Sequence, residues 1–329
     1  MCPRRLSTND WTATRMSDID ELLSIRAAEL YYEENKTQDE IGVLLRLTRW
    51  KVGRLLASAK AHGFIRIEIV HPRARRLPIE RRLRESTGLT EAIVVSSAGV
   101  ANDDELQSRT AQAAADYLTG LRPVPRTLGV SWGRTLHDLS LHLKPGWAPG
   151  VNVVQINGGV SLNQRHGTAA ATAVTIADKA GGSATLLPSP AIFERLETKQ
   201  AMEADRTVAG VLALARNAQA YVFSAGQADA NSALVDSGYL TVEQMSDIMA
   251  RGAVGDVVGR YIDKNGRIVD TELNERTVGI QLDQLRRAPL TIAVISGRSK
   301  HAIARAVVRN GLCTVLVTDE DTATALLDD

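Results

Sequence analysis

Polar and charged side chains recur in short, glycine-containing segments that directly follow apolar runs. In the segment Gly129–Leu136 (GVSWGRTL), an apolar run ends and a helical pattern begins. Free N–H groups at a helix N-terminus attract anions, because the positive end of the helix dipole lies there. Ser131 and Thr135 add hydroxyl donors, and Arg134 adds a guanidinium that can form paired bonds with an anion. The segment, with Gly133 at its turn, therefore predicts an anion-binding site, unless it is a plain strand-to-helix turn in which glycine only satisfies the geometry.

Four further segments have the same character. They are Gln155–Ser161, Phe223–Gln227, Gly252–Asp256 and Ser296–Lys300. The residues of interest in them are Asn157, Gly158, Gln227, Asp256 and Lys300. The carboxylate of Asp256 is expected to accept hydrogen bonds from sugar hydroxyls, and Lys300 is expected to pair with phosphate. Each segment alone is a weak signal, but five of them in one domain predict a shared ligand site.

Alternating strand and helix patterns have to position these segments. The predicted strands are short and rich in Val, Ile and Leu, as in parallel sheets covered on both faces. They are Ala92–Val95, Arg126–Val130, Val151–Ile156, Ser183–Leu187, Ala220–Phe223, Leu290–Ile295 and Cys313–Val317. The predicted helices between them include Asp103–Leu118, Gly133–Leu143, Thr168–Lys179, Thr207–Arg216, Val242–Ala250 and His301–Arg309. Together they predict a doubly wound, Rossmann-like α/β domain that binds ligands where the carboxyl ends of its strands meet.

Near the N-terminus, the segment Gln38–Leu56 predicts a helix-turn-helix. Apolar residues fall where two helices packed at nearly a right angle bury them, namely at Ile41, Leu45, Leu47, Val52 and Leu55. Gly42 lies where the helices must approach closely, and Thr37 with Glu40 matches a capping box. Arg46 occupies the turn where glycine is common, and at positive φ it would cost on the order of 1 kcal/mol unless the turn has another shape. The alternative is an ordinary helical hairpin within a larger core.

The outer face of the second helix is predicted to contact double-stranded DNA through Thr48, Arg49, Trp50, Lys51 and Arg54. Recognition helices read base edges with their N-terminal residues, and arginine suits guanine because it reaches O6 and N7 with two parallel hydrogen bonds. Thr48 is also a good N-cap, and Lys51 is expected to contact a base or a phosphate. Trp50 either packs on sugars or thymine methyl groups or covers the first helix.

Flanking segments complete the predicted organisation. Residues 1–16 are expected to be poorly ordered, Ser17–Tyr32 to form a supporting helix, and the alternating segment Phe64–Val70 to form a short wing strand. The predicted domains are a DNA-binding domain over residues 1–72, a basic linker over 73–88 with a short helix at Leu77–Ser86, and an effector-binding and oligomerisation domain over 89–329. The linker either lies along DNA phosphates or is simply solvated.

Charge is distributed unevenly along the 329 residues, although the net charge is only +1. Residues 46–84 contain 12 Lys and Arg but two acidic residues, whereas residues 85–329 contain 22 basic and 27 acidic residues. A basic head on a mildly acidic body suits a DNA-binding module attached to a regulatory domain. The two cysteines exclude a disulfide framework and a zinc site, and no metal or cofactor is predicted. Without a long apolar run or a signal peptide, the protein is expected to be cytoplasmic and to have no membrane partner.

These segments together identify a resemblance. The head LYYEENKTQDEIGVLLRLTRWKVGRLLASAKAHGFIRIEI and the body segments SWGRTL, VVQINGG, LPSP, DSGYL, GAVGD and ISGRSKHAIARAVVRNGLCTVLVTDEDTATALL resemble the SorC/DeoR-type family of bacterial sugar-responsive transcriptional regulators. The likeness covers nearly the whole chain. It implies a DNA-bound homotetramer with a phosphorylated sugar or polyol as effector. It also implies an effector domain that resembles sugar-phosphate isomerases and deaminases but is used for sensing.

The resemblance extends to individual positions of the ligand site. Arg134 and Thr135 fall where the family holds the effector phosphate, and Asp256 and Lys300 match its acidic hydroxyl-binding position and its lysine. Asn157 stands where members differ and some have a basic residue, and its amide cannot form an ion pair. Gln227 departs from the family's glycine-isoleucine-glycine loop, in which Ala225 also replaces a larger apolar residue. These departures concern which sugar is bound.

Two functions of different class remain at this stage. The first is a transcription factor whose affinity for DNA is switched by a metabolite. The second is a sugar-phosphate isomerase or deaminase fused to a DNA-binding head, which would need a general base. The available histidines are His137, His142, His166 and His301, and none lies in a glycine-containing loop beside an acid. Asp256 alone is a weak candidate for a base, so no catalytic residue and no enzyme activity is predicted.

Overall fold

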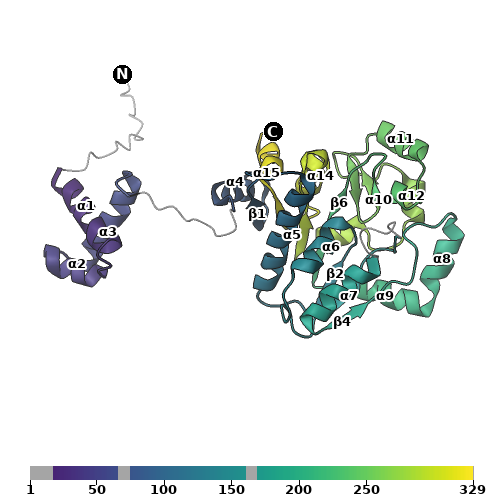
Figure 1. The fold of residues 1–329 in the computed structure, drawn as a ribbon, viewed down its shortest axis with the longest axis horizontal. Helices are drawn as coiled ribbons and strands as arrows, with labels where there is room; N and C mark the ends of the chain where they lie inside the picture. Colours follow the sequence, from purple (N-terminus) through teal and green to yellow (C-terminus); the bar gives the residue numbers. More distant parts are fainter. Residues whose placement is uncertain (1–17, 66–74, 161–168, 329) are drawn as a thin grey trace, which may run out of the picture. The chain divides into compact units, whose positions relative to one another are not determined.

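The computed structural model describes residues 18–65, 75–160 and 169–328 (Figure 1). Contacts between residues divide the chain into two compact units, residues 1–70 and 71–329. The expected disorder of residues 1–16 lies outside the described residues, as does the predicted wing strand from residue 66 onward. Phe64 and Ile65, its first two residues, are described and form no strand.

The described part of the first unit consists of α1 (Asp18–Tyr32), α2 (Gln38–Leu45) and α3 (Arg49–Ala61). Apolar side chains from all three helices form one core, which contains Ala27, Leu30, Ile41, Val52, Leu55 and Ala59. The predicted capping box is confirmed, because the Thr37 hydroxyl accepts from the Glu40 N–H and the Glu40 carboxylate accepts from the Thr37 N–H. Thr48 caps α3 as predicted, accepting from the Lys51 N–H at 3.3 Å.

The turn between α2 and α3 is tight, and two residues show why. A Cβ on Gly42 would lie 2.8 Å from the carbonyl oxygen of Leu47, so the predicted close approach is confirmed. Arg46 adopts left-handed φ and ψ of 54° and 43° as the C-cap of α2. Of the two shapes considered for this turn, the structure therefore has the one that strains a non-glycine residue.

In the described residues of the second unit, seven parallel strands form one sheet in the order β1-β10-β9-β5-β2-β3-β4. The strands are β1 (Glu91–Val95), β2 (Thr127–Val130), β3 (Asn152–Gln155), β4 (Ser183–Thr185), β5 (Ala220–Phe223), β9 (Thr291–Val294) and β10 (Val315–Asp319). All seven predicted strands are thus confirmed, with ends shifted by a few residues. From β2 the chain adds β3 and β4 on one side, and then β5, β9 and β10 on the other side of β2. Sheets of this kind bind ligands at the carboxyl ends of the two neighbouring strands where the order reverses, here β2 and β5.

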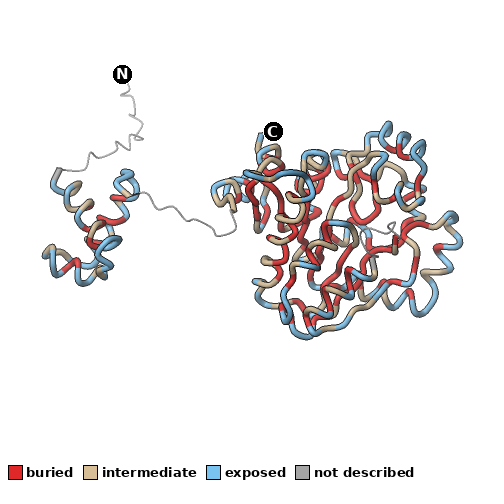
Figure 2. Tube along the Cα trace, viewed as in Figure 1, coloured by how far each residue is buried: buried red, intermediate tan, exposed pale blue. Residues whose placement is uncertain are grey.

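Helices cover both faces of this sheet (Figure 1). Residues that alternate along the strands separate into two cores, so that Val94 and Leu316 pack on one face and Val95 and Val317 on the other. In Figure 2 the strands and the inner sides of the helices are accordingly buried. The longer helices of the second unit after β1 include α5 (Asp103–Gly120), α6 (Arg134–His142), α7 (Ala169–Ala180), α8 (Leu196–Ala204), α9 (Arg206–Arg216), α11 (Val242–Ala250), α13 (Leu282–Arg287), α14 (His301–Arg309) and α15 (Glu320–Leu327).

The predicted linker over residues 73–88 is, from residue 75 on, part of the second unit. Its short predicted helix is present as α4 (Leu77–Thr87), which buries Leu83 completely and packs on β1 and α15. The second unit therefore begins earlier in the sequence than predicted, because the apolar side of α4 packs on it.

Three short strands of the second unit were not predicted from the sequence, and two of them overlap the segments Phe223–Gln227 and Gly252–Asp256, which were interpreted as loops. β6 (Ala225–Gly226), β7 (Gly255–Val257) and β8 (Arg260–Ile262) form a small antiparallel sheet. Gly226 pairs with Asp256 in it. A β-carbon on Gly226 would collide with the Asp256 carboxylate, so glycine is required at this pairing. The small sheet brings together β6 and β7, which are separated in the sequence by residues 227–254.

Candidate functional site

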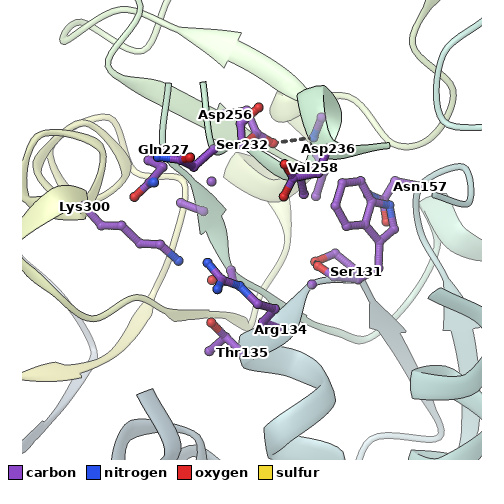
Figure 3. A pocket seen from close by; sticks show the side chains of 18 of the residues that line it. Ser131, Arg134, Thr135, Asn157, Gln227, Ser232, Asp236, Asp256, Val258 and Lys300 are labelled. Carbon is purple, nitrogen blue, oxygen red and sulfur yellow. Dashed lines mark hydrogen bonds between the residues drawn. The ribbon is translucent and has the colours of Figure 1, made fainter. Parts of the chain in front are cut away.

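One pocket lies at the carboxyl ends of the central strands β9, β5, β2 and β3 (Figure 3). The space that no atom fills is about 750 Å³, including the part open to solvent. Eight of the nine residues predicted for the effector site line it: Ser131, Gly133, Arg134, Thr135, Asn157, Gln227, Asp256 and Lys300. The loops that carry them follow different strands, so the sheet is what brings them together.

The first wall of the pocket is the N-terminus of α6. Gly133, with φ of 130°, precedes the helix, and within the described residues no side chain caps its first N–H groups. Those groups are therefore available to an anion. Ser131 and Thr135 are each 3% exposed, and the Arg134 side chain extends from the same turn into the pocket.

Lys300 brings a second cation to this wall. It is the last residue of the 3-10 helix η1 (Arg298–Lys300), and Figure 3 shows its ammonium group pointing toward the Arg134 guanidinium. Burial and the nearby charge of Arg134 lower the pKa of Lys300 to about 8, against the opposing effect of Asp256. Two cations that face each other repel, and an anion between them would relieve that repulsion.

Asp256 lies on the opposite side of the pocket, in β7. One of its carboxylate oxygens, Oδ2, accepts a hydrogen bond from the Gly259 N–H at 2.9 Å, in the turn that joins β7 to β8. Burial raises the pKa of Asp256 to about 6, although the Gly259 N–H and the charge of Lys300 oppose the shift. Near neutral pH the carboxylate can therefore accept a hydrogen bond from a hydroxyl group.

Asn157 is buried at the pocket's third side. The Asn157 side chain is 3% exposed, and in the described part of the chain its Oδ1 has no hydrogen-bond partner. Its segment is held by an isolated bridge to Gly279 and by the Gly158 N–H, which donates to Val278. A buried acceptor without a partner at a pocket is available to a donor from a bound molecule or from water.

Gly158 is the predicted site residue that does not line the pocket. A Cβ at this position would collide with the carbonyl oxygen of Pro190, so the glycine permits two segments to approach. Its own carbonyl accepts from the Trp132 indole N–H at 2.8 Å. Gly158 therefore supports the pocket wall, and its direct contact with a ligand stays a prediction.

Several pocket residues were not predicted. They are Gln107, Trp132, Ser224, Ala225, Gly226, Asn231, Ser232, Ala233, Asp236, Val258 and Gly259. Gln107 lies in the second turn of α5, and nothing in the sequence distinguishes it from other polar helix residues. Asp236 and Ser232 belong to α10 (Ala233–Asp236) and its N-cap. The motif DSGYL, which begins at Asp236, was recognised by resemblance without being assigned to the site.

The predicted DNA-contacting residues form a second, separate surface on α3. Arg49 and Arg54 are exposed, and Trp50 is 84% exposed, which excludes the alternative that it covers the first helix. Lys51 differs from the expectation, because its ammonium group forms an ion pair with Asp20 of α1 at 2.8 Å. This pair could not be predicted from local spacing, since its members are 31 positions apart in the sequence.

The fold and the pocket define a ligand-binding α/β domain joined to a small helical unit, and comparisons with known proteins identify the class. Residues 71–328 match the model of a sugar-binding domain family, Sugar-bind. The deoxyribonucleoside regulator of Bacillus subtilis (strain 168) is 30% identical over 312 residues, which cover 93% of this chain and 97% of that protein. The erythritol catabolism regulatory protein EryD of Brucella abortus (strain 2308) is 28% identical over 319 residues, covering 95% and 98%.

A solved structure agrees with these relatives. The full-length sorbitol operon regulator SorC from Klebsiella pneumoniae matches with a TM-score of 0.71 at 27% identity, covering 95% of this chain and 99% of that one. The chain therefore belongs to the SorC/DeoR-type family of sugar-binding transcriptional regulators. It is a transcriptional regulator, and the resemblance inferred from its sequence is confirmed.

Proposed function

We propose that this regulator binds operator DNA through α3 and that a phosphorylated, polyhydroxylated metabolite in the pocket controls the affinity. The observation that carries the proposal is the composition of the pocket. Arg134, Lys300 and the uncapped N-terminus of α6 form a cationic side, and Asp256 with Asn157 forms a side suited to hydroxyl groups. A sugar or polyol phosphate has both chemistries in one small molecule.

In this proposal α2 and α3 are a helix-turn-helix and α3 is its recognition helix. The support is the short turn, the confirmed caps and the exposed row of Arg49, Trp50 and Arg54 along one side of α3. Arg49 and Arg54 would read guanine edges, and Trp50 would pack on thymine methyl groups or sugars. Thr48 would contact the DNA backbone at the N-terminus of α3, and Lys51 would reach phosphate only by leaving Asp20.

The names of the relatives support a polyhydroxylated effector. They refer to deoxyribonucleosides, erythritol and sorbitol, which share hydroxyl groups on a short carbon skeleton. For this chain we propose that the phosphate lies between Arg134 and Lys300 beside Thr135 and Ser131. The hydroxyl groups then face Asp256, Asn157 and Gln227. The amide of Asn157 provides a neutral partner there.

The test combines two measurements on the full chain. Thermal-shift screening with phosphorylated and free sugars and polyols identifies binders, because a ligand of the folded state raises its stability by mass action. Gel-shift experiments with promoter DNA then measure DNA binding with and without each binder. We expect phosphorylated compounds to stabilise the protein more than their free counterparts and to change its DNA affinity. Equal stabilisation by both forms would contradict the phosphate site, and failure to shift any promoter DNA would contradict the DNA-binding role.

We also propose that the protein acts as a homotetramer in the cytoplasm, with two reading helices placed on DNA half-sites one helical turn or a multiple of it apart. In the described segments no helix has the length and apolarity to cross a membrane. Light scattering on the full chain, with and without operator DNA, measures the proposed assembly.

The enzyme alternative keeps one supporting observation, since the pKa of Asp256 is raised to about 6 and suits a general base. The known relatives are regulators, and we propose that a bound sugar phosphate is released unchanged. Incubation of the protein with each thermal-shift binder, followed by product analysis, decides the matter. Turnover that disappears in an Asp256→Asn variant would establish the enzyme function.

A further inference from the structure

A buried carboxylate joins the loop that carries Lys300 to the N-terminus of α15. The backbone N–H of Gly297, the residue before η1, donates to Oδ2 of Asp319 at 2.8 Å. Asp319 is fully buried, is the last residue of β10 and is also the N-cap of α15. Its Oδ1 accepts from the Thr322 N–H at 3.0 Å, and its Oδ2 accepts from the Thr322 hydroxyl at 2.6 Å. One carboxylate thus holds both a pocket loop and a helix cap, so a shift of the loop acts on the cap.

The next residue, Glu320, extends this connection to the start of the second unit. Its Oε2 accepts from the Arg76 guanidinium at 2.8 Å and from the Ser97 N–H at 3.4 Å. Arg76 also donates its backbone N–H to the carbonyl of Val94 in β1 at 2.8 Å. Because Glu320 directly follows the capping residue, its carboxylate moves with the N-terminus of α15.

Arg75 is fixed in the same place by a second acid. Its guanidinium forms two hydrogen bonds with Glu80, at 2.8 and 2.6 Å, and Glu80 is 4% exposed. The backbone of Arg75 forms an antiparallel bridge with Val95, and Val95 pairs with Asp319 on its other side. Asp319 is therefore connected to residues 75–76 by two routes, across β1 and through Glu320.

Residues 75–76 lie near the start of the second unit. They stand between the three-helix unit and the first strand of the ligand-binding sheet, and they are the first described residues after Ile65. A change in how these two residues are held in the second unit therefore changes the position at which the chain leaves that unit toward the three-helix unit. We define Arg75, Arg76, Glu80 and Glu320 as the N-terminal anchor.

We propose that Asp319 and Glu320 relay anion binding at Lys300 to the N-terminal anchor. The inference rests on the proposed function, since it assumes that an anion binds between Arg134 and Lys300. An anion that pairs with Lys300 in the pocket holds η1 in place, and η1 in turn holds Gly297 against Asp319. The cap of α15 and the Glu320–Arg76 ion pair are then held in one arrangement. Asp319 and Glu320 act as positioning residues in this relay and do not contact the ligand.

Hydrogen–deuterium exchange on the full chain tests the relay, with inorganic phosphate as the probe. Peptides from residues 131–136 and 296–301 report on the pocket, and peptides from residues 75–97 report on the anchor. We expect saturating phosphate to slow exchange by about threefold or more at both places. Slowing at the pocket alone would overturn the relay and leave the proposed ligand site intact. No slowing anywhere would overturn the anion site and the relay together.

Two variants remove the same ion pair from opposite sides, Glu320→Gln and Arg76→Gln. In both we expect phosphate to bind with less than about a twofold change in affinity and to slow exchange at the pocket as before. Slowing at residues 75–97 should be reduced, because the route through Glu320 is lost while the route across β1 remains. The matched control is Asp283→Asn, which removes an exposed ion pair of similar length with Arg286, 2.7 Å, outside this chain of contacts. The control should behave as the unmodified protein does.

A third variant, Asp319→Asn, tests the carboxylate that joins the loop to the cap. We expect it to weaken slowing at residues 75–97 more than Glu320→Gln does, because both routes start at Asp319, and slowing of pocket peptides by phosphate verifies that the variant is folded. Preserved slowing at residues 75–97 in both Glu320→Gln and Arg76→Gln would overturn the relay. Loss of phosphate binding in those two variants would also overturn it, because the residues would then act on the pocket itself.

Discussion

The outer face of α3 and the pocket of the second unit carry the same kinds of charged side chain in opposite surroundings. Arg49 has a side chain 69% exposed, and its ion pair with Asp39 is loose, at 3.6 Å. In the pocket, burial lowers the pKa of Lys300 to about 8 and raises that of Asp256 to about 6. Exposed cations suit the salt-dependent attraction to DNA phosphates. Desolvated charges suit the selective capture of one small anion, because each must be matched by a partner.

The largest expected effect is a loss of DNA binding that leaves ligand binding intact. In Gly42→Val, the added side chain would overlap the Leu47 carbonyl, which lies 2.8 Å from the first carbon added. Overpacking costs about 1–3 kcal/mol, a large fraction of the stability of so small a unit. We expect operator binding to fall by up to about 150-fold, the upper end of that cost, while thermal-shift responses to sugar phosphates stay unchanged. The readouts are gel shift and the helical circular dichroism signal.

Gly53→Ala is the control for that variant. Its Cβ would lie 3.4 Å from the Gln38 side chain, which can move aside, so the helical signal should be kept. Loss of ligand binding in Gly42→Val would contradict the separation of the two functions.

The next largest effect concerns the cationic side of the pocket. Lys300→Gln removes one charged donor from the proposed phosphate site, and such donors contribute about 1.5–3 kcal/mol. Affinity for sugar phosphates should fall about tenfold to a hundredfold by calorimetry, with DNA affinity in the absence of ligand unchanged. Arg298→Gln, on the same short helix but 85% exposed, should bind as the unmodified protein does. Equal losses in both variants would show that Lys300 is not a specific contact.

The pH dependence of ligand affinity tests whether the surroundings of Lys300 in the pocket lower its pKa. Lys300 has a lowered pKa of about 8, so it is charged below that pH and loses its charge as the pH rises through it. We expect phosphate affinity to fall about tenfold between pH 7 and pH 9. In Lys300→Gln the affinity should be low and flat over the same range. A lysine at its ordinary pKa would instead leave the unmodified protein flat up to pH 9.

The smallest expected effect lies in the turn before α3. Arg46 has φ of 54°, and Arg46→Gly relieves the strain of that conformation. The three-helix unit should gain about 0.5–1 kcal/mol, measured by denaturant titration of the helical signal. A loss of stability would mean that the Arg46 side chain contributes more to the turn than its backbone strain costs.

Local patterns predicted the first unit well, because capping and helix contacts depend on residues a few positions apart. Thr37, Glu40, Gly42 and Thr48 were all assigned from spacing and all have the expected contacts. Spacing along the sequence does not show which residue a long side chain will contact. The pairing of Lys51 with Asp20 on another helix was therefore missed.

The pocket was predicted in part, since strand ends and glycine-bearing turns mark where loops of a parallel sheet converge. The sheet's seven strands were found because each is an apolar run. The strands of the small antiparallel sheet escaped detection because they are two or three residues long and contain Gly226 and Gly255. Gln107 and Ser232 reach the pocket through tertiary packing alone, which no local pattern encodes.

DNA affinity with and without a pocket ligand tests the central claim most directly. Fluorescence anisotropy of a labelled promoter fragment, at constant salt, gives the dissociation constant of the full chain before and after addition of a sugar phosphate that binds by thermal shift. We predict a change of about tenfold or more that is absent in Lys300→Gln. A sugar phosphate that binds the pocket and leaves the DNA dissociation constant unchanged would contradict the account.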